Sequence, residues 1–250
     1  MTASRVGILG GTFDPIHCGH IDVATAAERA LSLTRMYVMT ANTPPHRRQP
    51  VASPFQRYAM VVLAVATRPG WRASDLELRS DAPSYTSDTL ARFHERGYRR
   101  TDLFFVVGAD AFADIATWHD YPGILDAAHF AVVSRPGAPV DALPNQLPDL
   151  ASRMTRVQVQ EGGSRDLRDP PDPRDPPDPT LIFLIDAQTA DVSATAIRRK
   201  CEAGQAIDGL VPPIVQQYIE QHGLYTSRQP GRRASDAPPP PAAGRLHGQD

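Results

Sequence analysis

The stretch from Gly10 to His20 constrains this chain more than any other. It follows an apolar run at residues 6–9, which predicts a buried strand, and precedes a helical periodicity at residues 21–33. The stretch is therefore a turn between a strand and a helix. Gly10 and Gly11 allow a ligand close to the backbone, and the helix start offers free N–H groups and a positive dipole end. Such a turn attracts anions.

Two histidines in this stretch, His17 and His20, are three positions apart, so both imidazoles lie on one face if the helix begins near Pro15 or Ile16. Each ring can donate hydrogen bonds to a phosphate and can carry charge when protonated. Three interpretations stay open: an ordinary glycine turn, a zinc site that uses Cys18, and nucleotide binding. The zinc site is disfavoured, because the chain has only 2 cysteines and the spacing lacks a companion pair.

Composition narrows the class of protein. A chain of 250 residues with 41% hydrophobic content can bury one substantial core. A net charge of -2 without a basic block speaks against a nucleic-acid partner, and no apolar run approaches the length of a membrane span. The two cysteines fit a reducing compartment, and no charged-then-apolar leader precedes the first strand. We therefore expect a cytoplasmic protein with no membrane or nucleic-acid partner.

Apolar runs and helical patterns alternate along the chain, which predicts an α/β fold. Further strands are expected at 36–39, 71–78, 103–107, 130–133, 157–159 and 181–185, and helices at 54–66, 86–96, 193–204 and 211–222, with others beginning near 111 and within 140–154. The run at 103–107 is fully apolar, as is typical of a central parallel strand covered on both faces. In the segment 71–78 we expect Asp75 and Glu77 to face solvent.

A single domain is expected over residues 1–225. Within it, residues 161–179 end in two identical copies of Arg-Asp-Pro-Pro-Asp-Pro and contain no apolar face that could stack. They predict a disordered insertion between two strands. Residues 226–250 hold no large apolar cluster and predict a disordered tail.

Candidate ligand-binding residues follow the ends of the predicted strands. Gly108 and Asp110 come directly after the central apolar strand, and ligands of parallel sheets gather at such carboxyl ends. Trp118 follows in a loop, where its indole is either part of the core or a platform for a heteroaromatic ring. His46 and Arg47 lie in a proline-rich loop that is either a phosphate clamp or a solvated basic loop.

Two later helix starts are further candidates. Thr86 or Ser87 can cap the helix at 86–96, and taken alone this is simply a well-capped helix. Ser193, Thr195 and Arg198 bring hydroxyls, amides and a guanidinium to the start of another helix. Capping explains these three residues when they stand alone. Beside the histidine turn, they fit the second half of a polyphosphate site better.

Taken in order, these stretches resemble the motifs of the bacterial nicotinate-mononucleotide adenylyltransferase family. His17-Cys18-Gly19-His20 is similar to the HxGH signature of the nucleotidylyltransferase superfamily, and the segment 193–198 is similar to its SxTxIR motif. The segments 44–46, 84–89 and 108–118 resemble the nicotinate branch. The resemblance spans about residues 5 to 225 and is interrupted by the repeat.

The resemblance implies a Rossmann-like, doubly wound and mainly parallel sheet with helices on both faces. It implies transfer of the adenylyl group of ATP to nicotinate mononucleotide, giving deamido-NAD and pyrophosphate. In such enzymes the phosphate of the acceptor attacks the α-phosphorus in line, and no side chain acts as a nucleophile. Mg²⁺ is expected to arrive with ATP, without a dedicated cage of protein ligands. ATP and nicotinate mononucleotide are the expected partners, and a homo-oligomer is left open.

The resemblance also implies roles for individual residues. The implied catalytic residues are His17, His20 and Arg198. The implied ATP-binding residues are Gly10, Gly11, Thr12, Phe13, His17, Gly19, His20, Gly108, Asp110, Ser193, Thr195, Ile197 and Arg198. Those implied for nicotinate mononucleotide are Asp14, His46, Arg47, Ser84, Tyr85, Thr86, Asp110 and Trp118. In this assignment the amides of Tyr85 and Thr86 receive the pyridine carboxylate, and Trp118 stacks on the ring.

Two alternatives stay beside this assignment. Pantetheine-phosphate adenylyltransferase shares the superfamily motifs, but that family is shorter and lacks the features at 84–86 and at Trp118. A catalytically silent nucleotide-binding module would use the insertion and the tail to bind partners. The presence of His17, His20 and Arg198 together argues against a silent module.

Overall fold

The computed structural model describes residues 5–43, 49–80, 82–157 and 179–227. Within these residues, 7 strands form one sheet in which all neighbouring strands are parallel. The order is β3-β2-β1-β4-β5-β7-β6, with β1 (Val6–Gly11), β2 (Arg35–Thr40), β3 (Trp71–Ser74), β4 (Leu103–Gly108), β5 (His129–Val133), β6 (Met154–Val157) and β7 (Ile182–Ile185). The chain runs from the centre to one edge and then to the other, so the expected doubly wound, Rossmann-like α/β fold is confirmed.

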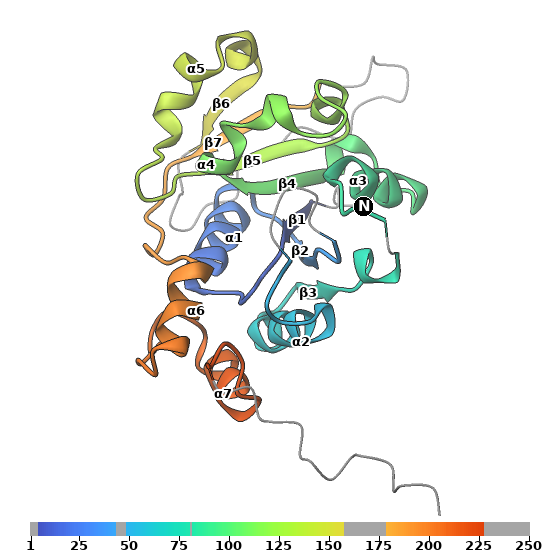
Figure 1. The fold of residues 1–250 in the computed structure, drawn as a ribbon. Coiled ribbons are helices and arrows are strands. Elements are labelled where there is room, and N and C mark those ends of the chain that lie inside the picture. Colours follow the sequence, from blue (N-terminus) through green and yellow to red (C-terminus); the bar gives the residue numbers. More distant parts are fainter. Residues whose placement is uncertain (1–4, 44–48, 81, 158–178, 228–250) are drawn as a thin grey trace, which may run out of the picture.

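Helices cover both faces of this sheet (Figure 1). One hydrophobic cluster lies beneath α1 (Cys18–Leu31), α2 (Pro54–Val65), α6 (Ala194–Glu202) and α7 (Pro213–Gln221). The other lies beneath α3 (Thr86–Glu95), α4 (Ala109–Phe112) and α5 (Leu143–Gln146). Along β4, Phe104 and Val106 belong to the first cluster, whereas Phe105 and Val107 belong to the second. This alternation explains why the central strand is fully apolar.

Several helix boundaries follow the local signals in the sequence. Ser53 and Gln56 form the capping box of α2: Gln56 N donates to Ser53 Oγ at 3.3 Å, and Ser53 N donates to Gln56 Oε1 at 2.9 Å. Ser193 caps α6 by accepting a hydrogen bond from the amide of Ala196. The expected cap of α3 was wrong, because the cap residue is Tyr85 and its side chain makes no capping bond.

The segment 71–78 differs from the single strand that we expected. β3 ends at Ser74, and a 3-10 turn follows at Glu77–Arg79. Glu77 was expected to face solvent, but it is only 9% exposed and accepts a hydrogen bond from Thr89 Oγ1 at 2.6 Å. In the sequence, a buried acid that has such a donor cannot be told from an exposed one.

The buried face of α2 is also shifted from the predicted apolar stripe. Val61 and Val65 are buried as expected, but Val62 is 39% exposed. The buried face also includes Arg57, which the apolar stripe does not contain and whose side chain is fully buried. A charged residue is rarely placed in a core by a sequence argument, because it needs partners that lie elsewhere in the chain.

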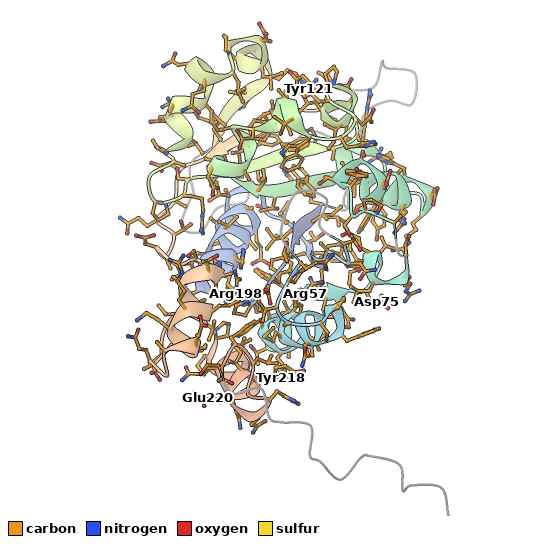
Figure 2. The ribbon with its side chains drawn as sticks, viewed as in Figure 1. Arg57, Asp75, Tyr121, Arg198, Tyr218 and Glu220 are labelled. Carbon is orange, nitrogen blue, oxygen red and sulfur yellow. The ribbon has the colours of Figure 1, made fainter. Side chains whose placement is uncertain are left out.

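Arg57 joins the ends of two central strands to the loop before α2 (Figure 2). Its Nη1 donates to the carbonyl oxygens of Thr12 at 2.6 Å and Ala41 at 2.7 Å. Its Nη2 donates to Asn42 O at 3.2 Å, and its Nε donates to Ala52 O at 3.3 Å. Carbonyl groups that follow strands have no ladder partner, so this guanidinium satisfies them together.

Some expectations fall on residues without a described position. His46, Arg47 and Val159 lie outside the described residues, as do the predicted insertion up to residue 178 and the predicted tail from residue 228. The single-domain boundary at residue 225 stays a prediction. Over the ranges that are described, no helix has the length and apolar character needed to cross a membrane.

Replacing Arg57 by lysine should destabilise the fold by about 3 kcal/mol, because one ammonium group cannot serve all the carbonyls and some are left buried without a donor. Urea unfolding of the purified variant measures this loss. The matched control is Arg79→Lys, whose side chain is 69% exposed and pairs with Asp75 at the surface. The control should change stability by less than about 0.5 kcal/mol. Equal effects from the two variants would contradict this account of Arg57.

Candidate active site

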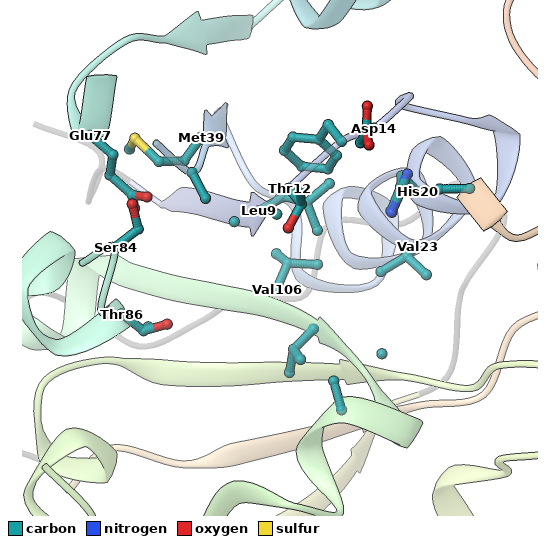
Figure 3. A pocket seen from close by; sticks show the side chains of 18 of the residues that line it. Leu9, Thr12, Asp14, His20, Val23, Met39, Glu77, Ser84, Thr86 and Val106 are labelled. Atoms are coloured by element: carbon teal, nitrogen blue, oxygen red, sulfur yellow. The ribbon is translucent and has the colours of Figure 1, made fainter. Parts of the chain in front are cut away.

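A cavity of about 840 Å³ opens at the carboxyl edge of the sheet (Figure 3). It lies where β1 and β4 end, which is where doubly wound sheets bind ligands. The structure brings most of the predicted site residues to this one cavity. They are Gly10, Gly11, Thr12, Phe13, Asp14, His17, His20, Ser84, Tyr85, Thr86, Gly108, Asp110, Trp118, Ser193, Thr195 and Arg198.

Two predicted residues with described positions, Ile197 and Gly19, are not among those that line the cavity. Ile197 is fully buried in the hydrophobic cluster beneath α6, where its side chain anchors the helix. Gly19 lies behind the cavity wall: a Cβ there would stand 2.6 Å from Arg135 Nη1 and 3.1 Å from Ala190 O. Its contribution is therefore close packing. His46 and Arg47 lie outside the described residues.

The β1–α1 turn places its two histidines together. Helix α1 begins at Cys18, slightly later than expected, so His17 is the cap residue and His20 lies in the first turn. The rings are stacked with centroids 3.6 Å apart, and His17 N donates to His20 Nδ1 at 3.2 Å. The edge of the Phe13 ring meets His20 at a centroid distance of 5.0 Å. The predicted pairing of the histidines is confirmed.

His17 is a neutral group in this site. Burial, and secondarily the charge of Arg135, lower the pKa of His17 to about 4. Its Nδ1 atom is buried and has no hydrogen-bond partner among the described residues. Near pH 7 this imidazole therefore offers hydrogen bonding rather than charge.

Two arginines face the cavity from different parts of the chain. Arg198, on α6, donates from Nη1 to Asp14 O at 2.6 Å and from Nη2 to Thr195 Oγ1 at 3.2 Å. Arg135 follows β5 and donates to Val192 O at 3.4 Å. Sequence analysis missed Arg135 as a site residue. Its place directly after a buried strand is a signal, but a weak one, because many strands end in a solvated arginine.

Asp14 was implied as a substrate ligand. In the structure, its carboxylate instead accepts hydrogen bonds from other residues of the protein. Oδ2 accepts from the amide of Val51 at 2.8 Å, and Oδ1 accepts from the amide of Ala52 at 3.1 Å. The Tyr225 hydroxyl donates to Oδ1 at 2.8 Å, and Arg198 Nη1 lies 3.7 Å from Oδ2. Burial and the charge of Asp14 raise the pKa of Tyr225, which keeps this hydroxyl a donor.

The start of α3 and the loop after α4 together form another wall of the cavity. The ring of Tyr85 stacks on His119 with centroids 4.1 Å apart, and Ser87 Oγ lies 3.1 Å from His119 Nδ1. Trp118 packs edge-on against Phe105 at 5.9 Å while it lines the cavity. The indole is thus both a core contact and a cavity wall. His119 was not assigned a role from the sequence, because its partners lie on another element.

The fold and the cavity define a nucleotide-binding α/β protein, and a family model described as cytidylyltransferase-like matches residues 8–200. Two relatives named nicotinate-nucleotide adenylyltransferase, from Salmonella typhimurium strain LT2 and Salmonella typhi, are each 38% identical over 222 residues. Each match covers 89% of this chain and 99% of the relative. The chain belongs to the nicotinate-nucleotide adenylyltransferase family.

Solved structures show the same fold at much lower identity. The Plasmodium falciparum nicotinic acid mononucleotide adenylyltransferase complexed with APC matches with a TM-score of 0.64 and 16% identity. The same enzyme complexed with NaAD matches with a TM-score of 0.63 and 17% identity. Both alignments cover 89% of this chain and 97% of the other. They support the fold and carry no assignment of residues here.

The buried neutral His17 should make the protein less stable in acid. The unfolded histidine titrates near 6.5, whereas the native pKa is about 4, so the unfolded state binds more protons between these values. Stability is therefore fully present above pH 6.5 and falls as the pH drops toward 4, by up to about 3 kcal/mol from this group.

Urea unfolding at pH 7.5 and pH 4.5 measures this effect as the difference between the wild type and His17→Gln. The wild type should lose more stability on acidification than the variant. His222→Gln, at an exposed position on the far end of α7, is the control and should behave like the wild type. If His17→Gln shows the same pH dependence as the wild type, His17 is not the buried neutral group described here.

Proposed function

We propose that this protein transfers the adenylyl group of ATP to nicotinate mononucleotide, forming deamido-NAD and releasing pyrophosphate. The observation that carries the proposal is the meeting of three walls around one cavity. The first is the histidine turn of β1–α1, the second is the start of α6 with Arg198, and the third is the α3 wall with Trp118. Family membership supports the same reaction.

The first two walls suit a triphosphate. Neutral His17 and the neighbouring His20 can donate hydrogen bonds to phosphate oxygens, and α1 directs its positive end toward them. Arg198 supplies a charge that is held in place by Asp14 and Thr195. A cation fixed before the substrate arrives needs little reorganisation during the reaction. In this proposal His20 lies nearest the transferred phosphorus, and Arg198 holds the outer phosphates.

The third wall suits the pyridine ring of the acceptor. Trp118 offers an aromatic face, and Thr86 is the first residue of α3, where N–H groups have no acceptor within the helix. The N–H of Tyr85 already donates to Pro83 O at 3.1 Å. In this proposal the pyridine carboxylate therefore accepts its hydrogen bond from the Thr86 amide. An amide that meets a carboxylate loses a strong partner when a carboxamide replaces it.

The chemistry that this arrangement supports is direct transfer. A phosphate oxygen of nicotinate mononucleotide attacks the α-phosphorus of ATP, the new P–O bond forms, and the bond to pyrophosphate breaks. The residues of the chain bind and orient both reactants and neutralise charge on the phosphates. None of them needs to form a covalent bond to the adenylyl group.

Magnesium is part of the proposal as an ion carried by ATP. When bound, it would neutralise the phosphates and assist departure of pyrophosphate. In the described ranges no three His, Cys, Asp or Glu side chains gather into a group that could hold a metal ion. The proposal keeps the expectation that the ion has no dedicated cage of protein ligands.

A cytoplasmic location belongs to the same proposal, because the reaction draws on the ATP of that compartment.

The two alternatives have less support. The relatives that cover almost the whole chain carry the nicotinate name, and none of the matches described above points to phosphopantetheine as the acceptor. A silent nucleotide-binding module would not need both the phosphate walls and the aromatic wall around one cavity. Both alternatives stay outcomes of the experiment that tests the proposal.

The function is tested by pyrophosphate release with ATP and Mg²⁺, using nicotinate mononucleotide, nicotinamide mononucleotide and phosphopantetheine as acceptors. We expect the nicotinate form to give the highest kcat/KM, because only its carboxylate fully pairs with the Thr86 amide. Turnover of phosphopantetheine alone would move the protein to the other adenylyltransferase family. ATP binding without turnover of any acceptor would indicate the silent module.

Removing the His20 side chain tests the phosphate wall. We expect His20→Ala to lower kcat by about 100-fold or more, as is typical when a preorganised donor to a transition state is lost. ATP binding, followed by calorimetry, should weaken far less, because Arg198 and the helix ends are intact. His222→Ala at the exposed end of α7 is the control and should keep full activity. A His20→Ala variant with wild-type kcat would contradict the assignment.

A further inference from the structure

Glu77 is a buried carboxyl group in the cavity wall that the proposed mechanism does not use. It is 9% exposed, lies in the short turn after β3, and lines the cavity together with Ser84 and Thr86 (Figure 3). Burying a carboxylate is costly unless its oxygens accept hydrogen bonds. Its donors therefore indicate what this acid is for.

Both hydroxyl groups that face Glu77 belong to the amino end of α3 or to the residues just before it. Thr89 Oγ1 donates to Glu77 Oε1 at 2.6 Å, and Thr89 is itself only 2% exposed. The Ser84 hydroxyl faces Glu77 in Figure 3; burial raises the pKa of Glu77, and the hydroxyls of Thr89 and Ser84 oppose that rise. Ser84 and Thr89 stand on either side of Tyr85 and Thr86 in the chain. The two hydroxyls therefore bracket the residues that form the start of the helix.

Ser84 also connects this acid to the loop after β2. Its hydroxyl oxygen accepts from the amide of Asn42 at 3.0 Å, while its own amide donates to Thr43 O at 3.0 Å. Asn42 Nδ2 in turn donates to Ser80 O at 2.7 Å, just after the turn that carries Glu77. These bonds hold Ser84 against the loop after β2 while its hydroxyl faces Glu77.

An acid at this place has a consequence for the choice of acceptor. A carboxylate with an idle oxygen would accept a hydrogen bond from the NH₂ group of a carboxamide. Glu77 would then favour the nicotinamide form. Thr89 Oγ1 donates to the acid instead, and the Ser84 hydroxyl faces it. Because the Thr89 bond also holds the start of α3, the position of the helix and the choice of acceptor are linked.

We propose that Glu77 is a positioning residue for acceptor selectivity, which holds Ser84 and Thr89 so that the Thr86 amide meets the pyridine carboxylate. This inference rests on the proposed function. Glu77 acts through the start of α3 and does not itself take part in the transfer. Its loss should therefore affect binding of the acceptor and leave the chemistry of the ATP side in place.

The experiment compares Glu77→Ala with Glu77→Gln in steady-state kinetics with both mononucleotides. Glutamine keeps an oxygen that can accept from Ser84 and Thr89, whereas alanine keeps none. We expect Glu77→Ala to raise KM for nicotinate mononucleotide about 10-fold and to lower the nicotinate-over-nicotinamide ratio of kcat/KM by a similar factor. KM for ATP should stay within about 2-fold. Glu77→Gln should stay within about 3-fold of the wild type in every constant.

Two further variants keep the test decisive if Glu77→Ala folds poorly. Thr89→Val removes the partner hydroxyl at nearly constant volume and should raise KM for the acceptor in the same way, whereas Thr89→Ser should restore it. The matched control is Asp75→Asn. Asp75 also follows β3, but it pairs with Arg79 at the surface. It should leave all constants unchanged.

Several results would overturn the inference. If Glu77→Gln is as impaired as Glu77→Ala, the negative charge of Glu77 matters rather than the hydrogen bonds that it accepts. An equal rise in KM for ATP would show general loosening of the cavity. Unchanged selectivity in both Glu77→Ala and Thr89→Val would remove the link to the acceptor. If the wild type does not turn over nicotinate mononucleotide at all, the proposed function fails, which is a separate outcome.

Discussion

Asp14 is the group through which distant parts of the chain are joined at the cavity. Its carboxylate accepts from the amides of Val51 and Ala52 and from the hydroxyl of Tyr225, and Arg198 lies against both its carbonyl and its carboxylate. A buried carboxylate is tolerated only when donors surround it, so these elements must all be in place for any one of them to be stable there. The β1–α1 turn, the loop before α2, the segment after α7 and α6 are therefore coupled.

This coupling explains how the site holds positive charge before its anionic substrate arrives. Arg198 is anchored by Asp14 and Thr195, and Arg57 fixes the neighbouring backbone by donating to Thr12 O. The buried His17 stays neutral, which limits repulsion among the cations around the cavity. The free-energy cost of holding these charges in place is met when the protein folds, so little rearrangement is needed when phosphates bind.

The parts that sequence analysis predicted correctly depend on local signals. The apolar run of β4, the glycine turn before His20 and the cap at Ser193 each reflect a rule that acts within a few residues. Arg57 and Glu77 could not be predicted, because a buried charge is recognised only by partners that lie far away in the sequence. Most residues implied by the resemblance to a known family line one cavity, but the resemblance could not show that the carboxylate of Asp14 is bound by the protein itself.

In the proposed reaction, the adenylyl group passes directly from ATP to the acceptor and never to the chain. The most direct test is the stereochemistry of transfer, with ATP carrying a chiral thiophosphate at the α-phosphorus. A single in-line displacement predicts inversion of configuration at phosphorus in the dinucleotide product. Retention of configuration would require two displacements and hence a covalent adenylyl-protein intermediate, and it would contradict a site that works by positioning and charge alone.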